Sequence, residues 1–238
     1  MQYEHSGFSS VRGARAMLCA LAFALAFGSG LCAAASQLGF TATVTPGLIA
    51  SMVGRFSEQA RQRLAAWVNF AVLQQASKAK SPQPASENAQ LRSVNDYINT
   101  VPWYDDQVHW GQVDYWATPA ETMASHGGDC EDFAIAKYFM LKELGVPIER
   151  LRITYVRAGK VNQPHMVLAY YASPGGEPLI LDNLDARVLP ASARADLVPV
   201  YSFNDDDVVM VKGNYKGSAS TIRAWQSVIG RLEREARL

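Results

Sequence analysis

The stretch that most constrains this chain is Gly-Gly-Asp-Cys-Glu-Asp-Phe at residues 127–133. Apolar residues recur at helical spacing after it, and a glycine and a proline then end the pattern, which predicts a helix from about Cys130 to Leu144. The two glycines allow the backbone to turn tightly into that helix. Cys130 therefore opens a helix, where free N–H groups and the positive end of the helix dipole favour an anion. This position predicts a nucleophilic thiolate.

A thiolate at Cys130 needs a cation in addition to the helix. Lowering the pKa of a cysteine from ~8.5 to roughly 5.5 requires ~4 kcal/mol, whereas a helix terminus supplies at most ~2 kcal/mol. The usual additional source is the imidazolium of a histidine that an acid holds in place. Downstream, His165 opens a strand-like run and Asp182 ends the next one, with the turn-forming Ser-Pro-Gly-Gly at residues 173–176 between them.

The pairing of these two strands tests whether the side chains can meet. Antiparallel pairing centred between residues 174 and 175 places position i opposite about 349 − i, because 174 + 175 = 349. Asp182 then faces Val167, and His165 is its diagonal neighbour on the same face, although a slip of one residue would separate them. The sequence therefore predicts Cys130 as nucleophile, His165 as general base and Asp182 as the acid that holds the imidazole. The alternative is a core histidine and a turn-forming aspartate.

A cysteine at a helix start, a histidine on one strand and an aspartate on the next is the order of the transglutaminase-like cysteine enzymes. The Asp-Cys-Glu-Asp-Phe-Ala run at 129–134, with Trp103 and Tyr-Trp-Ala-Thr-Pro at 115–119 upstream, resembles the bacterial transglutaminase-like cysteine proteinases of the LapG type. The resemblance covers roughly residues 95–212. It implies a cysteine endopeptidase with an α+β, papain-like or transglutaminase-like fold, in which a helical lobe packs on an antiparallel sheet.

Three carboxylates beside the thiol suggest a metal ion. Asp129, Glu131 and Asp132 flank Cys130, and their charges should raise its pKa and oppose the thiolate. A bound cation would offset them, and clustered carboxylate oxygens suit calcium. The resemblance implies calcium dependence and assigns the metal-ligand role to Asp129, Glu131 and Asp132. The alternative is that Asp129 caps the helix and the other two complement its dipole.

Residues 1–35 predict an export signal. Two arginines precede the apolar segment 16–27, and three alanines at 33–35 offer a cleavage site. The apolar run is shorter than the ~20 residues that a membrane span needs. We therefore expect residues 36–238 to form one exported domain that does not insert into a membrane, with an uncleaved anchor as the alternative.

The composition limits the partners and the chemistry of this domain. After cleavage the chain would contain one cysteine, Cys130, so no disulfide could form within it and a reactive thiol is expected; an inert buried cysteine is the alternative. The 22 basic and 22 acidic residues balance, which gives no electrostatic basis for a nucleic-acid partner.

The resemblance further implies a periplasmic location, a substrate and a regulator. The substrate would be a large secreted adhesin, cut near its N-terminus around paired alanines, which releases the adhesin and disperses the biofilm. The regulator would be an inner-membrane receptor that senses cyclic di-GMP and sequesters the protease. Two alternatives remain: the same triad could serve a transglutaminase or deamidase, or the fold could be a binding module without turnover.

The remaining pattern predicts how the core is covered. Two helices, at about 57–77 and 87–100 with a polar break between them, should cover the core, and Thr118-Pro119 should begin a short capped helix. Period-two patterns predict five strands, and the chain should end in a helix; these ranges are 151–157, 165–172, 178–182, 198–203 and 207–211 for the strands and 217–238 for the helix.

Overall fold

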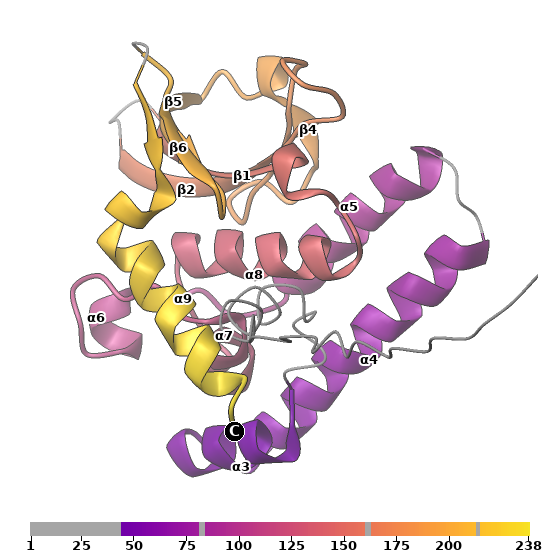
Figure 1. The fold of residues 1–238 in the computed structure, drawn as a ribbon, viewed down its shortest axis with the longest axis vertical. Coiled ribbons are helices and arrows are strands. Elements are labelled where there is room, and N and C mark those ends of the chain that lie inside the picture. The colour runs from indigo at the N-terminus through magenta and orange to yellow at the C-terminus, as the bar shows by residue number, and fades with distance from the viewer. Residues whose placement is uncertain (1–43, 81–83, 160–162, 213–214) are drawn as a thin grey trace, which may run out of the picture.

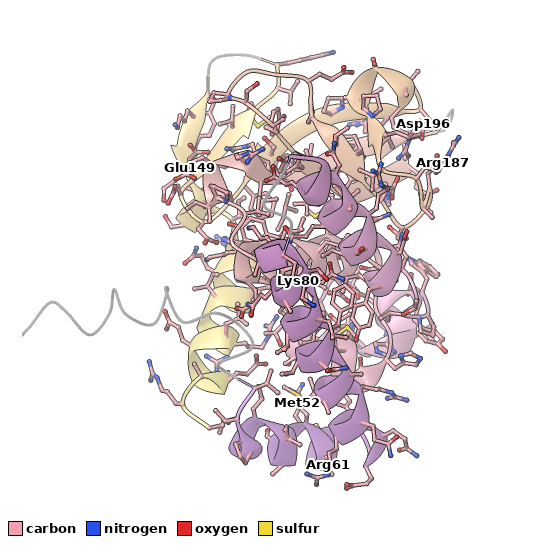
Figure 2. All side chains as sticks on the ribbon, turned by 90° about the vertical axis from the view of Figure 1, so that its right-hand side faces the viewer. Met52, Arg61, Lys80, Glu149, Arg187 and Asp196 are labelled. Atoms are coloured by element: carbon pink, nitrogen blue, oxygen red, sulfur yellow. The ribbon has the colours of Figure 1, made fainter. Side chains whose placement is uncertain are left out.

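The structure is a computed structural model that describes residues 44–80, 84–159, 163–212 and 215–238. The predicted export signal at residues 1–35 lies outside these ranges. The helices gather on one side of a single sheet (Figure 1), and their bounds are α3 Pro46–Arg55, α4 Gln59–Lys80, α5 Pro84–Ile98, α6 Asp106–His109, α7 Pro119–Ser125, α8 Cys130–Glu143 and α9 Arg223–Glu235. Figure 2 shows α4 crossing the molecule from Arg61 toward Lys80.

The described strands form one antiparallel sheet in the order β4-β3-β2-β1-β5-β6-β7. Most neighbours in this order are also neighbours along the chain, which is typical of antiparallel sheets joined by short connections. The strands are β1 Leu151–Ala158, β2 Gln163–Tyr170, β3 Leu179–Leu181, β4 Leu189–Pro190, β5 Leu197–Phe203, β6 Asp207–Met210 and β7 Lys216–Ser218.

The central helix α8 packs on β1 and β2 and is flanked by α5 and α7 (Figure 1). Its buried residues run without interruption from Asp132 to Leu141, as expected for a helix that is enclosed on all sides. The predicted helical lobe on an antiparallel sheet is therefore confirmed. The first turn of α8, which carries Cys130, lies at the end of this packed core.

The hairpin of β2 and β3 has the predicted register. Leu168 pairs with Leu181 and Ala169 with Ile180, so that paired positions sum to 349 as expected. Because alternate residues share a face, His165 and Asp182 lie on the side of the sheet that carries the small apolar cluster of Val167 and its neighbours.

Two predicted boundaries were wrong. The final helix begins at Arg223 and not at Gly217, because residues 216–218 form β7 beside β6 and residues 219–221 form a short 3₁₀ helix. The polar break between the two long helices is also shorter than expected, since α4 continues to Lys80 and α5 begins at Pro84. The capping box at Thr118 and the helix from Cys130 are confirmed.

The turn before Cys130 depends on close approach of the backbone to its neighbours. The left-handed residue of this turn is His126, with φ 63°, and neither Gly127 nor Gly128 has a positive φ. A Cβ on Gly127 would lie 2.5 Å from the His109 ring, and one on Gly128 would lie 2.6 Å from Asp132. Trp103 forms a parallel bridge with Gly128, which fixes the preceding loop against this turn.

Glu235, at the end of α9, should make stability depend on pH. Burial raises its pKa to about 7, although Thr118 Oγ1 donates a hydrogen bond to Oε1 at 2.7 Å. A carboxyl group with a raised pKa in the folded state stabilises the fold below its unfolded pKa of ~4.3, and this contribution is lost as pH rises through about 7. Glu235→Gln should therefore flatten the decline in unfolding free energy between about pH 4 and about pH 7.

Urea unfolding across this pH range measures the effect. The matched control is Glu233→Gln, because Glu233 is exposed on the same helix. An equally steep pH dependence in the wild type and in Glu235→Gln would contradict the prediction.

Candidate active site and carboxylate cluster

Cys130 begins α8 and is the single free cysteine within the described ranges. Its thiol donates a hydrogen bond to Glu131 Oε2 at 3.0 Å. Burial, followed by the charge of Glu131, raises the pKa of Cys130 far above its ordinary value, while the backbone N–H of Met166 opposes the shift. The helix start alone thus leaves a protonated thiol, and a thiolate here requires nearby positive charge.

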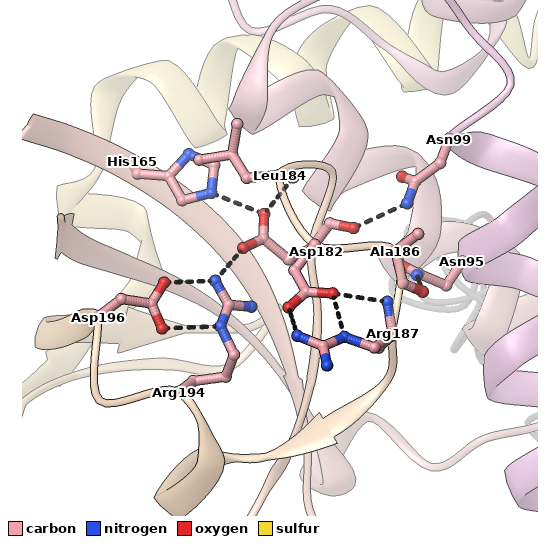
Figure 3. A network of polar contacts seen from close by, with 10 residues as sticks. Asn95, Asn99, His165, Asp182, Leu184, Ala186, Arg187, Arg194 and Asp196 are labelled. Atoms are coloured by element: carbon pink, nitrogen blue, oxygen red, sulfur yellow. Dashed lines mark hydrogen bonds and ion pairs between the residues drawn. The ribbon is translucent and has the colours of Figure 1, made fainter.

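His165 and Asp182 form a buried hydrogen-bonded pair (Figure 3). His165 Nε2 lies 2.7 Å from Asp182 Oδ1, and the two residues are 5% and 1% exposed. Burial raises the pKa of Asp182, but the hydrogen bond and charge of His165, with other donors, lower it to about 2. Because Nε2 is engaged by the carboxylate, the Nδ1 of His165 is left for another partner.

The backbone around Asp182 is held from the helical lobe. Asn99 Nδ2 donates to the Asp182 carbonyl oxygen and Asn95 Nδ2 to that of Ala186, both at 2.8 Å (Figure 3). Leu184 N also donates to Asp182 Oδ1 at 3.0 Å. Sequence reasoning assigned this helix only a covering role, whereas Asn95 in α5 and Asn99 just after it fix the loop that carries the acid.

Cys130 and His165 line the same pocket, which has a volume of about 280 Å³. Its walls include Tyr155 and Tyr201, whose rings stack at 5.2 Å between β1 and β5. A β-bulge follows Tyr155, and bulges commonly redirect side chains beside functional sites. A thiol and an imidazole held by a carboxylate thus line one aromatic-walled pocket, and these are the groups that covalent attack on a carbonyl uses.

A cluster of carboxylates adjoins the thiol. Asp106, Asp129 and Asp132 each direct an oxygen to within 4.8 Å of the others, and Glu131 forms a second such group with Asp106 and Asp114. The structure thus brings together the three predicted metal-ligand candidates around a residue that sequence reasoning missed, Asp106 of α6.

The hydrogen bonds of this cluster distinguish its members. Asp132 accepts from Ala117 N at 2.6 Å and from Asp129 N at 3.4 Å, so it joins the upstream loop to the helix start. Asp106 Oδ1 and Asp129 Oδ1 are buried without a hydrogen-bond partner in the part of the chain that the structure describes. Two unpaired buried carboxylate oxygens close together suit a hard cation.

The electrostatics of the cluster agree with this interpretation. Burial raises the pKa of Asp106 to about 6. Burial and then the charge of Glu131 raise the pKa of Asp129 to about 10, and burial raises that of Asp132 well above its usual range. Such shifts mean that the folded chain resists negative charge here, and a divalent cation would reverse this preference.

Comparison with known proteins identifies a family and solved relatives. The family model described as bacterial transglutaminase-like cysteine proteinase matches residues 63–196. The structure of Legionella pneumophila LapG is 38% identical, with TM-score 0.65 over 77% of this chain and 94% of that chain. Its EGTA-treated form gives TM-score 0.66 with 95% of that chain covered, and its calcium-bound form 0.63 with 97%. The coverage of this chain and the identity are the same for both, 77% and 38%.

No curated protein sequence gives a significant match. Among the described residues, none of the helices has both the length and the apolar character to span a bilayer.

Proposed function

The chain belongs to the bacterial transglutaminase-like cysteine proteinase family, and we propose that it cleaves peptide bonds with Cys130, His165 and Asp182 in a calcium-dependent manner. The observation that carries the proposal is the buried contact of 2.7 Å between His165 Nε2 and Asp182 Oδ1, beside a pocket that Cys130 shares with His165. The contact with Asp182 orients the His165 imidazole, and His165 lines the same pocket as the Cys130 thiol.

In the proposed reaction His165 Nδ1 accepts the proton of Cys130, and the sulfur attacks the peptide carbonyl carbon. The backbone N–H of Cys130, at the start of α8, stabilises the oxyanion. The imidazolium then protonates the leaving amine as the carbon–nitrogen bond breaks and a thioester remains. His165 then takes a proton from water, which attacks the thioester carbon; the carbon–sulfur bond breaks, the carboxylic acid product leaves, and the imidazolium returns the proton to the thiolate. Asp182 holds the tautomer and the orientation of the ring throughout.

The carboxylate cluster fits a calcium ion. Asp106 and Asp129 offer unpaired oxygens, and Glu131 and Asp132 lie in the same cluster. Calcium would supply positive charge that offsets these carboxylates next to the thiol. The relative LapG has been solved in a calcium-bound and an EGTA-treated form, which supports the assignment.

The family resemblance supports a more specific role. We propose a periplasmic protease that cuts near the N-terminus of a large secreted adhesin, around paired alanines, and so disperses the biofilm. The pocket of about 280 Å³ that Cys130 and His165 line is where the scissile peptide would lie. We also propose sequestration by an inner-membrane receptor that senses cyclic di-GMP.

Incubation of the purified protein with N-terminal fragments of candidate adhesins tests this function. We expect two shorter products in calcium and none in excess EGTA, with activity restored when calcium is added back. The control is Cys130→Ala, which should yield no product. Cleavage that persists in EGTA would remove the metal from the proposal, and cross-linked or deamidated fragments of unchanged length would favour a transglutaminase or deamidase.

A further inference from the structure

Arg194 contacts the side of Asp182 that faces away from His165. Its Nη2 lies 2.7 Å from Asp182 Oδ2, while Oδ1 of the same carboxylate contacts His165 Nε2 (Figure 3). Arg194 is 5% exposed, so this charged contact is almost fully enclosed. One carboxylate thus has each of its oxygens engaged by a different side chain.

A second carboxylate holds Arg194 in place. Asp196 accepts Arg194 Nε at 3.0 Å and Nη2 at 2.9 Å, a two-point contact that fixes the plane of the guanidinium. The Asp196 carbonyl oxygen in turn accepts from Gly159 N at 3.0 Å, which anchors the loop to the end of β1. Arg194 is therefore presented to Asp182 by a fixed loop.

We propose that Arg194 is a positioning residue that fixes the Asp182 carboxylate so that Oδ1 stays directed at His165; this inference rests on the proposed function of that pair. With Oδ2 held, the carboxylate cannot rotate about its Cβ–Cγ bond. The imidazole then keeps Nε2 toward Asp182 and Nδ1 free for the thiol. Displacements of ~1 Å in such a group can cost ~100-fold in rate.

The competing explanation is that Arg194 only holds the loop of residues 191–197 in place. A nearby pair supplies the matched control, because Arg187 contacts Asp185 at 2.7 Å and 3.0 Å on the same side of the site (Figure 3). The Arg187 side chain is 74% exposed, and none of its hydrogen bonds in the described structure involves Asp182. Arg187→Met removes a guanidinium, as Arg194→Met does, but leaves the His165–Asp182 pair and its contacts unchanged.

The first readout is the NMR signal of the His165 Nε2 proton in the full chain labelled with ¹⁵N-histidine, assigned by its loss in His165→Ala. We expect the signal in the wild type and in Arg187→Met, its loss or displacement in Arg194→Met, and partial retention in Arg194→Lys. A role limited to the loop would change the unfolding temperature and leave this signal in place.

The second readout is turnover of a quenched fluorescent peptide with an Ala-Ala centre, in calcium. Arg194→Met should lower kcat by about 10 to 100-fold with little change in KM, and Arg194→Lys should recover part of the loss. In an Asp182→Asn background, Arg194→Met should cause no further loss of kcat, because Arg194 acts through the Asp182 carboxylate. Arg187→Met should retain wild-type turnover.

An unchanged signal and unchanged turnover in Arg194→Met would overturn the inference, as would a full additional loss in the Asp182→Asn background. If Arg194→Met does not fold, Asp196→Asn decides by the same readouts, since it releases the guanidinium and leaves it in the chain. If the wild type cleaves no peptide, the proposed function fails, while the His165 signal still decides the role of Arg194.

Discussion

Replacing His165 with alanine should reduce cleavage of the Ala-Ala peptide by about ten-thousandfold or more, the loss typical of a removed triad base. The physical reason lies at Cys130, where burial and the charge of Glu131 raise the pKa of the thiol. Without the imidazole the thiol keeps its proton, because the carboxylate that it contacts, Glu131, opposes the thiolate by its negative charge. Alkylation of Cys130 by iodoacetamide, followed on the tryptic peptide by mass spectrometry, should slow in parallel.

His126→Asn serves as the control for this substitution. His126 has φ 63°, a conformation that asparagine tolerates, and it lies in the same turn that leads to Cys130. Both its cleavage rate and its alkylation rate should stay near those of the wild type. Wild-type alkylation in His165→Ala would show that the thiol is activated in another way, and equal losses in both variants would point to disruption of the turn.

Calcium should raise the unfolding temperature, and Asp106→Asn should remove most of this effect. A ligand at about 100 times its Kd adds about 2.7 kcal/mol to stability, which corresponds to a shift of about 5–10 °C for a domain of this size. Asp106 is the sharpest test because its Oδ1 is buried without a hydrogen-bond partner among the described residues. Differential scanning calorimetry in calcium and in EGTA measures the shift.

Glu58→Gln is the control, since Glu58 is exposed and forms a surface ion pair with Arg61. Its calcium-dependent shift should equal that of the wild type. The same shift in Asp106→Asn would exclude Asp106 as a ligand, and the absence of a shift in the wild type would remove the cation from this cluster. Asp106→Asn should also raise the calcium concentration needed for cleavage.

The parts of the fold that local pattern determines could be predicted. The helix from Cys130 follows from apolar spacing and flanking glycines, and the register of β2 and β3 follows from the position of one short turn. The helix α3 was not predicted, although Thr45 followed by Pro46 is an N-terminal capping signal that the sequence contains. The rule that a threonine followed by a proline begins a helix would therefore have predicted α3.

The missed residues of the site depend on contacts between distant segments. Asp106 reaches the carboxylate cluster because Trp103 pairs with Gly128, and no spacing rule relates these positions. Arg194 follows Asp182 after the two-residue strand β4 and a short 3₁₀ turn, which show no periodicity, and its contact depends on Asp196 and on the end of β1. Sequence pattern identifies residues within one helix or strand. The contacts of Asp106 and Arg194 depend instead on how loops pack against distant segments.

The hydrogen bonds from Asn95 and Asn99 to the backbone around Asp182 limit how far the protein could be shortened. A fragment that begins after Asn99 would keep the sequence of the thiol helix and of the whole sheet, yet it would lose two hydrogen bonds, each worth ~1 kcal/mol, that hold the backbone around the acid. Such a fragment would also lack Leu91, Val94 and Ile98, which are fully buried in the core. Truncation from the N-terminal side should therefore impair folding as well as catalysis, and a functional fragment has to begin upstream of α5.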